Sequence, residues 1–331
     1  MPAKSGVSGG LVAALPAQFG LGVFSPPLDG RGNSVRAIAA CEDLSARFGL
    51  HMMRRSVRSV PVFARFLHGD ELRSDRERPM RERRILAERG RRILVCELQS
   101  DMGFVGAETV LRAIGADLAG VGWLVLDLNR VSRLEAVAAA MLDAFTGELA
   151  QRGVRLIVAD PWQRALLESA AAEFGTLSGA LEHCEDELLG EAGLAEAQAV
   201  PLAEQDILRD LPPARVEQLA AQMRTVELDA GDEIRDLALG LVTRGRLQAR
   251  DADGRRAAAA GPGAAFGPLT LLEPVGLTWA AVASSTCLVL TRNGRIELAD
   301  SDPAALAALQ EAIACDLADR LRVTPHLAQH R

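Results

Sequence analysis

The sequence contains almost no lysine and no tyrosine. Of its 37 Lys and Arg residues only Lys4 is a lysine, and aromatic residues make up 4% of the chain. A mechanism that needs a lysine as its base can therefore use only Lys4, and no mechanism can use a tyrosine hydroxyl.

Clustered cysteine and histidine patterns are also missing. The five cysteines are widely spaced without a CxxC pair, and the five histidines form no HExxH motif. This spacing is typical of reduced thiols in a cytoplasmic protein, so we expect no disulfide framework, no metal site and no cofactor. The cysteines are Cys41, Cys96, Cys184, Cys287 and Cys315.

Long apolar runs and an excess of positive charge are absent as well. No run reaches the roughly 18 residues that span a bilayer, and residues 1–10 lack the features of a signal peptide. The formal charge is −7 and the isoelectric point is about 5.4. We therefore expect a cytoplasmic protein with no membrane span and no nucleic-acid partner.

The chain does contain enough apolar material for several cores. It has 331 residues, a hydrophobic share of 49% and a mean hydropathy of +0.10. At roughly 100–200 residues per domain, this length predicts two or three domains. We assign residues 1–53 to an incomplete segment, 54–92 to a linker, 93–195 and 201–322 to two domains, and 323–331 to a tail.

Residues 1–53 are glycine-rich at first and helical afterwards. We expect a buried strand over residues 20–24 and a helix over 35–48, with Asn33 or Ser34 as its N-cap and Gly49 after its end. So few elements cannot close a core. We therefore expect this segment to pack against something else.

Residues 54–92 contain thirteen arginines against six acidic residues. A run of this kind is typical of a linker or a solvated helix, and it is also compatible with a patch for nucleic acid or anionic lipid. Interleaved acids favour the linker. We likewise interpret the acidic stretch 182–196 as a solvated helix.

The two remaining domains differ in their patterns. Apolar runs at 93–98, 123–128 and 154–158 alternate with helical spacing at 105–118 and 134–149, which predicts a small α/β domain. In the second, a helix over 206–223 precedes a glycine-rich β roll over 226–290. A helix over 303–321 follows, capped by Ser301 or Asp302, and leaves no room for a DNA-reading helix pair.

The first residues carry a motif of catalytic interest. Lys4-Ser5-Gly6 matches the third element of β-lactamase-type acyl transfer sites, where a cation and a hydroxyl line the site. Together with residues 23–29 and 32–36, the string 2–10 resembles the C-terminal end of the serine-dependent glutaminase family. The resemblance implies hydrolysis of L-glutamine through an acyl-enzyme on a β-lactamase-like fold. It also implies that Val7 supplies an oxyanion-hole N–H, with substrate contacts from Lys4, Ser5, Gly6 and Val7.

The family's nucleophile motif, however, is absent from this sequence. That nucleophile is the serine of an S-x-x-K motif, and no serine lies three residues before Lys4. The family also uses tyrosine hydroxyls, which this chain lacks. We therefore assign no catalytic residue and expect no glutaminase activity from this chain alone.

The middle region resembles the STAS domain, a small α/β regulatory module. The resemblance rests on residues 97–102, 125–131 and 153–158. Phosphoregulated members carry a hydroxyl near the start of the second helix, where Ala136 and Val137 stand here. A fixed docking role is therefore expected in place of a phosphorylation switch.

The last region resembles a cyclic nucleotide-binding domain, through residues 231–234 and 261–267. A working cassette continues F-G-E-L-A-L-L and then P-R-x-A, in which the Glu binds the ribose and the Arg binds the phosphate. Here Phe266 and Gly267 are followed by Pro268 at the Glu position, and Leu277 stands at the Arg position. We therefore expect no cyclic nucleotide to bind.

The fold class that follows is multidomain α/β and α+β. It comprises a partial β-lactamase-like glutaminase segment, an α/β STAS-like domain, and a β-roll cyclic nucleotide-binding-like domain with flanking helices. The leading hypothesis is a self-associating glutaminase-family protein that uses L-glutamine only when its catalytic domain is completed. The alternative is a non-catalytic regulatory or scaffold protein, and a transcription regulator is the third hypothesis.

Overall fold

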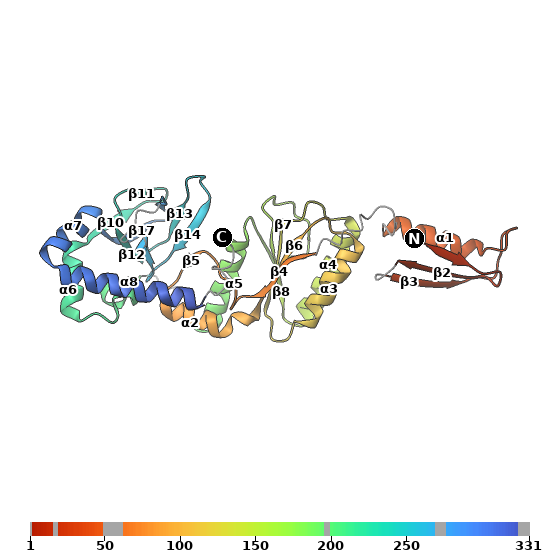
Figure 1. Ribbon diagram of the computed structural model, residues 1–331, viewed down its shortest axis with the longest axis horizontal. Coiled ribbons are helices and arrows are strands. Elements are labelled where there is room, and N and C mark those ends of the chain that lie inside the picture. The colour runs from red at the N-terminus through yellow and green to blue at the C-terminus, as the bar shows by residue number, and fades with distance from the viewer. Residues whose placement is uncertain (1, 16–18, 49–61, 195–198, 269–275, 324–331) are drawn as a thin grey trace. The chain divides into compact units, whose positions relative to one another are not determined.

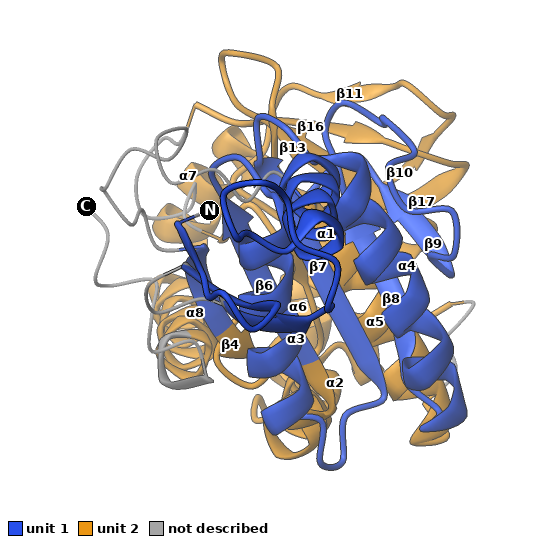
Figure 2. Cartoon of the chain, turned by 90° about the vertical axis from the view of Figure 1, so that its right-hand side faces the viewer, with its two compact units in different colours: residues 1–66, 94–176 blue, residues 67–93, 177–331 orange. Residues whose placement is uncertain are grey.

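The computed structural model describes residues 2–15, 19–48, 62–194, 199–268 and 276–323. The chain divides into two compact units: residues 1–66 with 94–176, and residues 67–93 with 177–331 (Figure 2). In the described part of the chain, no helix combines the length and the apolar character needed to cross a bilayer.

The first sheet lies in residues 3–24 (Figure 1). Strands β1 (Ala3–Ser5), β2 (Gly10–Leu15) and β3 (Phe19–Phe24) form it in that order, with antiparallel pairing throughout. Helix α1 (Val35–Arg47) follows, and the Ser34 side chain accepts a hydrogen bond from the Ala37 N–H. The predicted strand and helix are thus present, and Ser34 is the N-cap. The prediction that this strand is buried is wrong, since Phe24 is 71% exposed.

The second sheet of this unit has the order β4-β6-β7-β8-β9. Its strands are β4 (Phe63–His68), β6 (Ile93–Gln99), β7 (Trp123–Arg130), β8 (Arg155–Ala159) and β9 (Ala172–Phe174). Strands β7, β8 and β9 are parallel, and helices α3 (Phe104–Ala116) and α4 (Ala136–Gln151) share one apolar core with the sheet. The predicted strands and helices of this region are confirmed, whereas β4 and β9 were not expected.

The other unit contains the predicted β roll. One sheet has the order β10-β17-β12-β15 and the other β11-β16-β13-β14-β5. Their strands are β10 (Arg224–Leu228), β11 (Glu233–Ile234), β12 (Leu239–Arg244), β13 (Leu247–Arg250), β14 (Arg256–Ala260), β15 (Ala265–Phe266), β16 (Thr278–Ala281), β17 (Ser285–Leu290) and β5 (Arg76–Glu77).

The helices beside the roll confirm the prediction in part. Helix α7 (Arg292–Ser301) precedes α8 (Pro303–Val323), and Asp302 caps α8 because its Oδ1 accepts the Ala305 N–H at 2.9 Å. The helix expected over 206–223 is broken into a 3-10 turn (Asp206–Leu208) and α6 (Pro213–Gln222). Pro212 and Pro213 explain the break, since proline lacks an N–H and restricts the residue before it.

The region assigned to a linker contains regular structure. Residues 54–61 lie outside the described residues, but β4, β5 and α2 (Met80–Arg89) all fall within 54–92. Strand β5 pairs in parallel with β14, with Arg76 opposite Ala259 and Glu77 opposite Ala260. Helix α5 (Leu177–Glu191), which the sequence placed in the middle domain, belongs to the same unit as the roll. Of the assigned tail, residues 324–331 lie outside the described residues.

Candidate functional site

The two faces of the first sheet differ sharply. Leu11 and Ala13 on one face are 3% and 1% exposed and pack against Ala37 and Cys41 of α1. On the opposite face Val12 and Phe24 are 64% and 71% exposed. An apolar face without a partner is a mark of an interaction surface.

Lys4 belongs to this exposed face. It stands opposite Val12 in the pairing of β1 with β2, and Val12 stands opposite Gly22 of β3. Cross-strand partners point to the same side of a sheet. The outer face therefore combines one cation, two exposed apolar side chains and glycines that keep it flat. We call this surface, defined by Lys4, Val12, Gly22 and Phe24, the outer face.

Ser5 does not accompany Lys4 on that face. Neighbouring residues of a strand point to opposite sides, and the Ser5 Oγ accepts a hydrogen bond from the Ser34 N–H at 3.3 Å. The expected side-by-side pair of cation and hydroxyl is therefore not formed within β1. The Ser5 hydroxyl instead connects β1 to the N-terminus of α1.

Val7 lies at the tip of a tight turn. Gly6 donates its N–H to the Gly10 carbonyl at 2.8 Å, and Gly9 donates to the Gly6 carbonyl at 3.1 Å. The Val7 side chain is 82% exposed, and within the described residues its N–H makes no backbone hydrogen bond. Gly9 has φ +90°, and a Cβ there would lie 2.5 Å from the Ser25 carbonyl oxygen. This turn therefore needs glycine at position 9, and it presents an unused donor at position 7.

The cassette positions of the roll are occupied by apolar packing. Phe266 is fully buried, its ring lies 5.1 Å from that of Trp279, and a Cβ on Gly240 would overlap it. Leu277, at the expected arginine position, packs against the same core. Gly267 has φ +65° and Pro268 is buried, while residues 269–275 lie outside the described residues.

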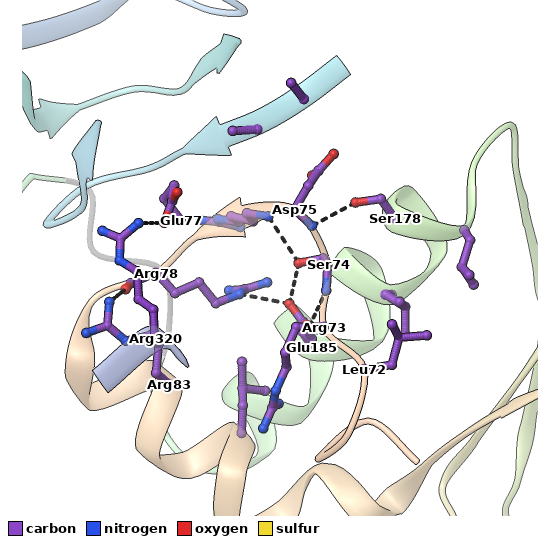
Figure 3. Close-up of a pocket in the computed structure, with 16 residues that line it drawn as sticks. Leu72, Arg73, Ser74, Asp75, Glu77, Arg78, Arg83, Ser178, Glu185 and Arg320 are labelled. Carbon is purple, nitrogen blue, oxygen red and sulfur yellow. Dashed lines mark hydrogen bonds and ion pairs between the residues drawn. The ribbon is translucent and has the colours of Figure 1, made fainter. Parts of the chain in front are cut away.

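The second unit contains a buried network of ion pairs that the sequence did not predict. Arg78 and Glu185 have side chains only 3% and 2% exposed, and Arg78 Nε lies 2.9 Å from Glu185 Oε2. Glu185 also accepts hydrogen bonds from the Ser74 N–H and hydroxyl at 2.9 and 2.6 Å (Figure 3). The arginines of the expected linker and the acids of the expected solvated helix are thus buried together.

Further pairs extend this network to the roll. Arg76 lies 2.9 Å from Asp186, and Glu182 pairs with Arg246 of the roll at 3.1 Å and with Arg256. Burial opposes the ionisation of Glu182, but the hydrogen bond from Arg256 and the surrounding arginine charges outweigh it, so its pKa is lowered. The opposite charges of residues 54–92 and 182–196 could have indicated that the two stretches pair. Their separation by about a hundred residues made this pairing hard to predict.

No titratable cluster suggests a metal centre. The described residues contain no group of three or more His, Cys, Asp or Glu side chains placed to bind an ion. The outer face presents the Lys4 cation, and the turn presents the Val7 N–H, which makes no backbone hydrogen bond among the described residues.

Comparisons with known proteins find similarity to glutaminases in residues 1–53. The glutaminase family model matches residues 1–53. Glutaminase 2 of Bradyrhizobium diazoefficiens is 32% identical over 294 residues, which cover 82% of this chain and 46% of that protein. A glutaminase of Trichormus variabilis is 62% identical over 52 residues, 16% of each chain. The chain thus spans about half the length of the longer curated relative.

Solved structures match parts of the chain. The N-terminal domain of a transcriptional regulator from Streptomyces coelicolor is 25% identical, with a TM-score of 0.31, and covers 37% of this chain and 96% of that one. A putative cyclic nucleotide-binding protein from Geobacter metallireducens is 18% identical, with a TM-score of 0.31 and coverages of 35% and 91%. By its curated relatives and its matched segment, this chain is similar to bacterial glutaminases.

Proposed function

We propose that this chain contributes the β1 strand, the Val7 turn and the outer face to a catalytic domain that hydrolyses L-glutamine to L-glutamate and ammonia. The observation that carries the proposal is the exposed apolar face beside Lys4, in the segment that matches the glutaminase family. A sheet on which Val12 and Phe24 are exposed to solvent has one face that is not packed into a core. Covering each side chain would stabilise the domain by about 1.5–3 kcal/mol.

The proposed chemistry divides between this chain and the rest of the domain. A serine of an S-x-x-K motif outside this sequence attacks the glutamine carboxamide carbon, ammonia leaves, and water hydrolyses the acyl-enzyme to glutamate. The Val7 N–H stabilises the negative charge that develops on the carbonyl oxygen. Lys4 places a positive charge on the outer face.

Association with the missing part of the domain tests the proposal. We expect this chain to co-purify with a glutaminase catalytic portion that carries the S-x-x-K motif and ends before the counterpart of residues 1–53. Val12→Asp should prevent association, because it places a charge in a contact that becomes buried. Val35→Asp changes an exposed valine of α1 outside the outer face and should leave association intact. Equal association of both variants would contradict the proposal. In the absence of its complement, the same face would drive the expected self-association.

The STAS-like assignment of residues 93–195 and the degenerate cyclic nucleotide-binding-like assignment of 201–322 stay parts of this proposal. In the second case, apolar packing at Phe266, Trp279 and Leu277 leaves the phosphate without an arginine partner at the expected position. We therefore expect millimolar cyclic AMP to leave the melting temperature of the chain unchanged. A ligand that binds only the folded state raises it, so a reproducible rise would contradict this expectation.

A further inference from the structure

A cavity of about 470 Å³ lies in the second unit, away from the cassette residues of the roll. Its walls come from residues 72–78, α2, α5, β14 and α8 (Figure 3). Much of its lining is apolar, from the alanines of β14 at positions 257 and 258 and from the side chains of Leu72, Leu86, Leu177 and Leu181.

Arginines supply the charge around this cavity. Four of the five that line it have carboxylate partners: Arg76 with Asp186, Arg78 with Glu185, Arg83 with Asp316, and Arg320 with Glu77. In each of these pairs the carboxylate offsets the positive charge of the arginine. The fifth arginine, Arg73, is the exception.

The guanidinium of Arg73 is buried without a partner. Its three nitrogens are inaccessible to water, and none makes a hydrogen bond in the described part of the chain. Burial lowers the pKa of Arg73, although the charges of Glu185 and Asp70 oppose this. Glu185 is already occupied by Ser74 and Arg78. An unpaired buried cation is costly, and five donors remain unused.

We propose that this cavity binds a small organic anion with a single acidic group and an apolar body. The anionic group would pair with the Arg73 guanidinium, which would have to rotate from its inaccessible position into the cavity that Arg73 lines. The apolar body would contact the surrounding leucines. The one lining arginine that makes no hydrogen bond among the described residues matches one anionic group, and the apolar walls disfavour a ligand with several charges.

Octanoate is the probe that tests this site, with the full chain observed by thermal denaturation. We expect millimolar octanoate to raise the melting temperature, while octanol, which lacks the charge, and inorganic phosphate, which lacks the apolar body, do not. If octanol or phosphate stabilises the chain as well as octanoate does, the proposed ligand class is wrong.

Arg73→Met separates the site from a structural role of the arginine. It removes an uncompensated buried charge, so the melting temperature without ligand should rise by about 2–4 °C. Octanoate binding should weaken by at least about tenfold, since a charge-assisted pair is lost. Arg84→Met, an exposed arginine of α2 outside the cavity lining, should change neither value. A lower melting temperature or retained octanoate binding in Arg73→Met would overturn the proposal.

Discussion

Replacing Glu185 by alanine is expected to lower the free energy of unfolding of the second unit by at least about 2 kcal/mol. The carboxylate lies at the centre of the buried network, where it accepts one bond from Arg78 and two from Ser74. Its removal leaves the Arg78 guanidinium, 3% exposed, with Asp186 at 2.9 Å and Glu82 at 3.2 Å as its remaining carboxylate partners. The cost arises from the lost charge-assisted bond of Arg78 and from the two donors of Ser74 that lose their acceptor.

Urea denaturation followed by circular dichroism measures this effect. The matched control is Glu187→Ala, on the same helix, because the Glu187 side chain is 31% exposed and its His183 contact spans 3.7 Å. A half-exposed pair of this kind contributes at most about 1 kcal/mol. Similar losses in the two variants would show that the network adds nothing beyond an exposed contact.

The second large effect is expected on catalysis. In the completed glutaminase, Lys4→Met should lower kcat/KM by about 10²-fold or more, because removing one group that stabilises the developing charge typically costs this much. Lys4 is exposed in this chain, and its side chain adds little to the folded segment. The variant should therefore fold and associate normally.

Arg36→Met provides the control for charge alone. Arg36 is an exposed cation of α1, so its loss changes the net charge of the segment by the same amount. We expect its kcat/KM to equal that of the unaltered enzyme. If Lys4→Met retains full activity, or if both variants lose activity equally, Lys4 has no direct part in the reaction.

Local patterns predicted much of the fold. The apolar runs that became β6, β7 and β8 are buried as expected, and the caps Ser34 and Asp302 lie among the proposed residues. Each depends on neighbours within a few positions of the chain. The break in the helix before the roll also depends on neighbouring residues, and Pro212 and Pro213 could have indicated it.

Long-range pairing accounts for most of what the sequence did not predict. Arg78 and Glu185 are 107 positions apart, so each stretch alone resembled a solvated run of charge. Burial became favourable only because the two stretches meet beside the roll. Composition could not show that Arg73 makes no hydrogen bond among the described residues while Arg76 and Arg78 form ion pairs.

The sequence likewise predicted only some features of the candidate site. The motif at Lys4 lies in β1, within the residues that the glutaminase family model matches. Strand alternation alone could have separated Lys4 from Ser5. The exposure of Val12 and Phe24 depends on what covers the sheet, which no pattern within residues 1–53 specifies.

Ammonia release from glutamine tests the central claim most directly. The assay compares this chain alone, the complementary catalytic portion alone, and the two combined. We predict release only from the combination, because the S-x-x-K motif and the β1 strand then belong to one domain. If the associated pair releases no ammonia, the glutaminase proposal is contradicted and a regulatory or scaffold protein is the better interpretation.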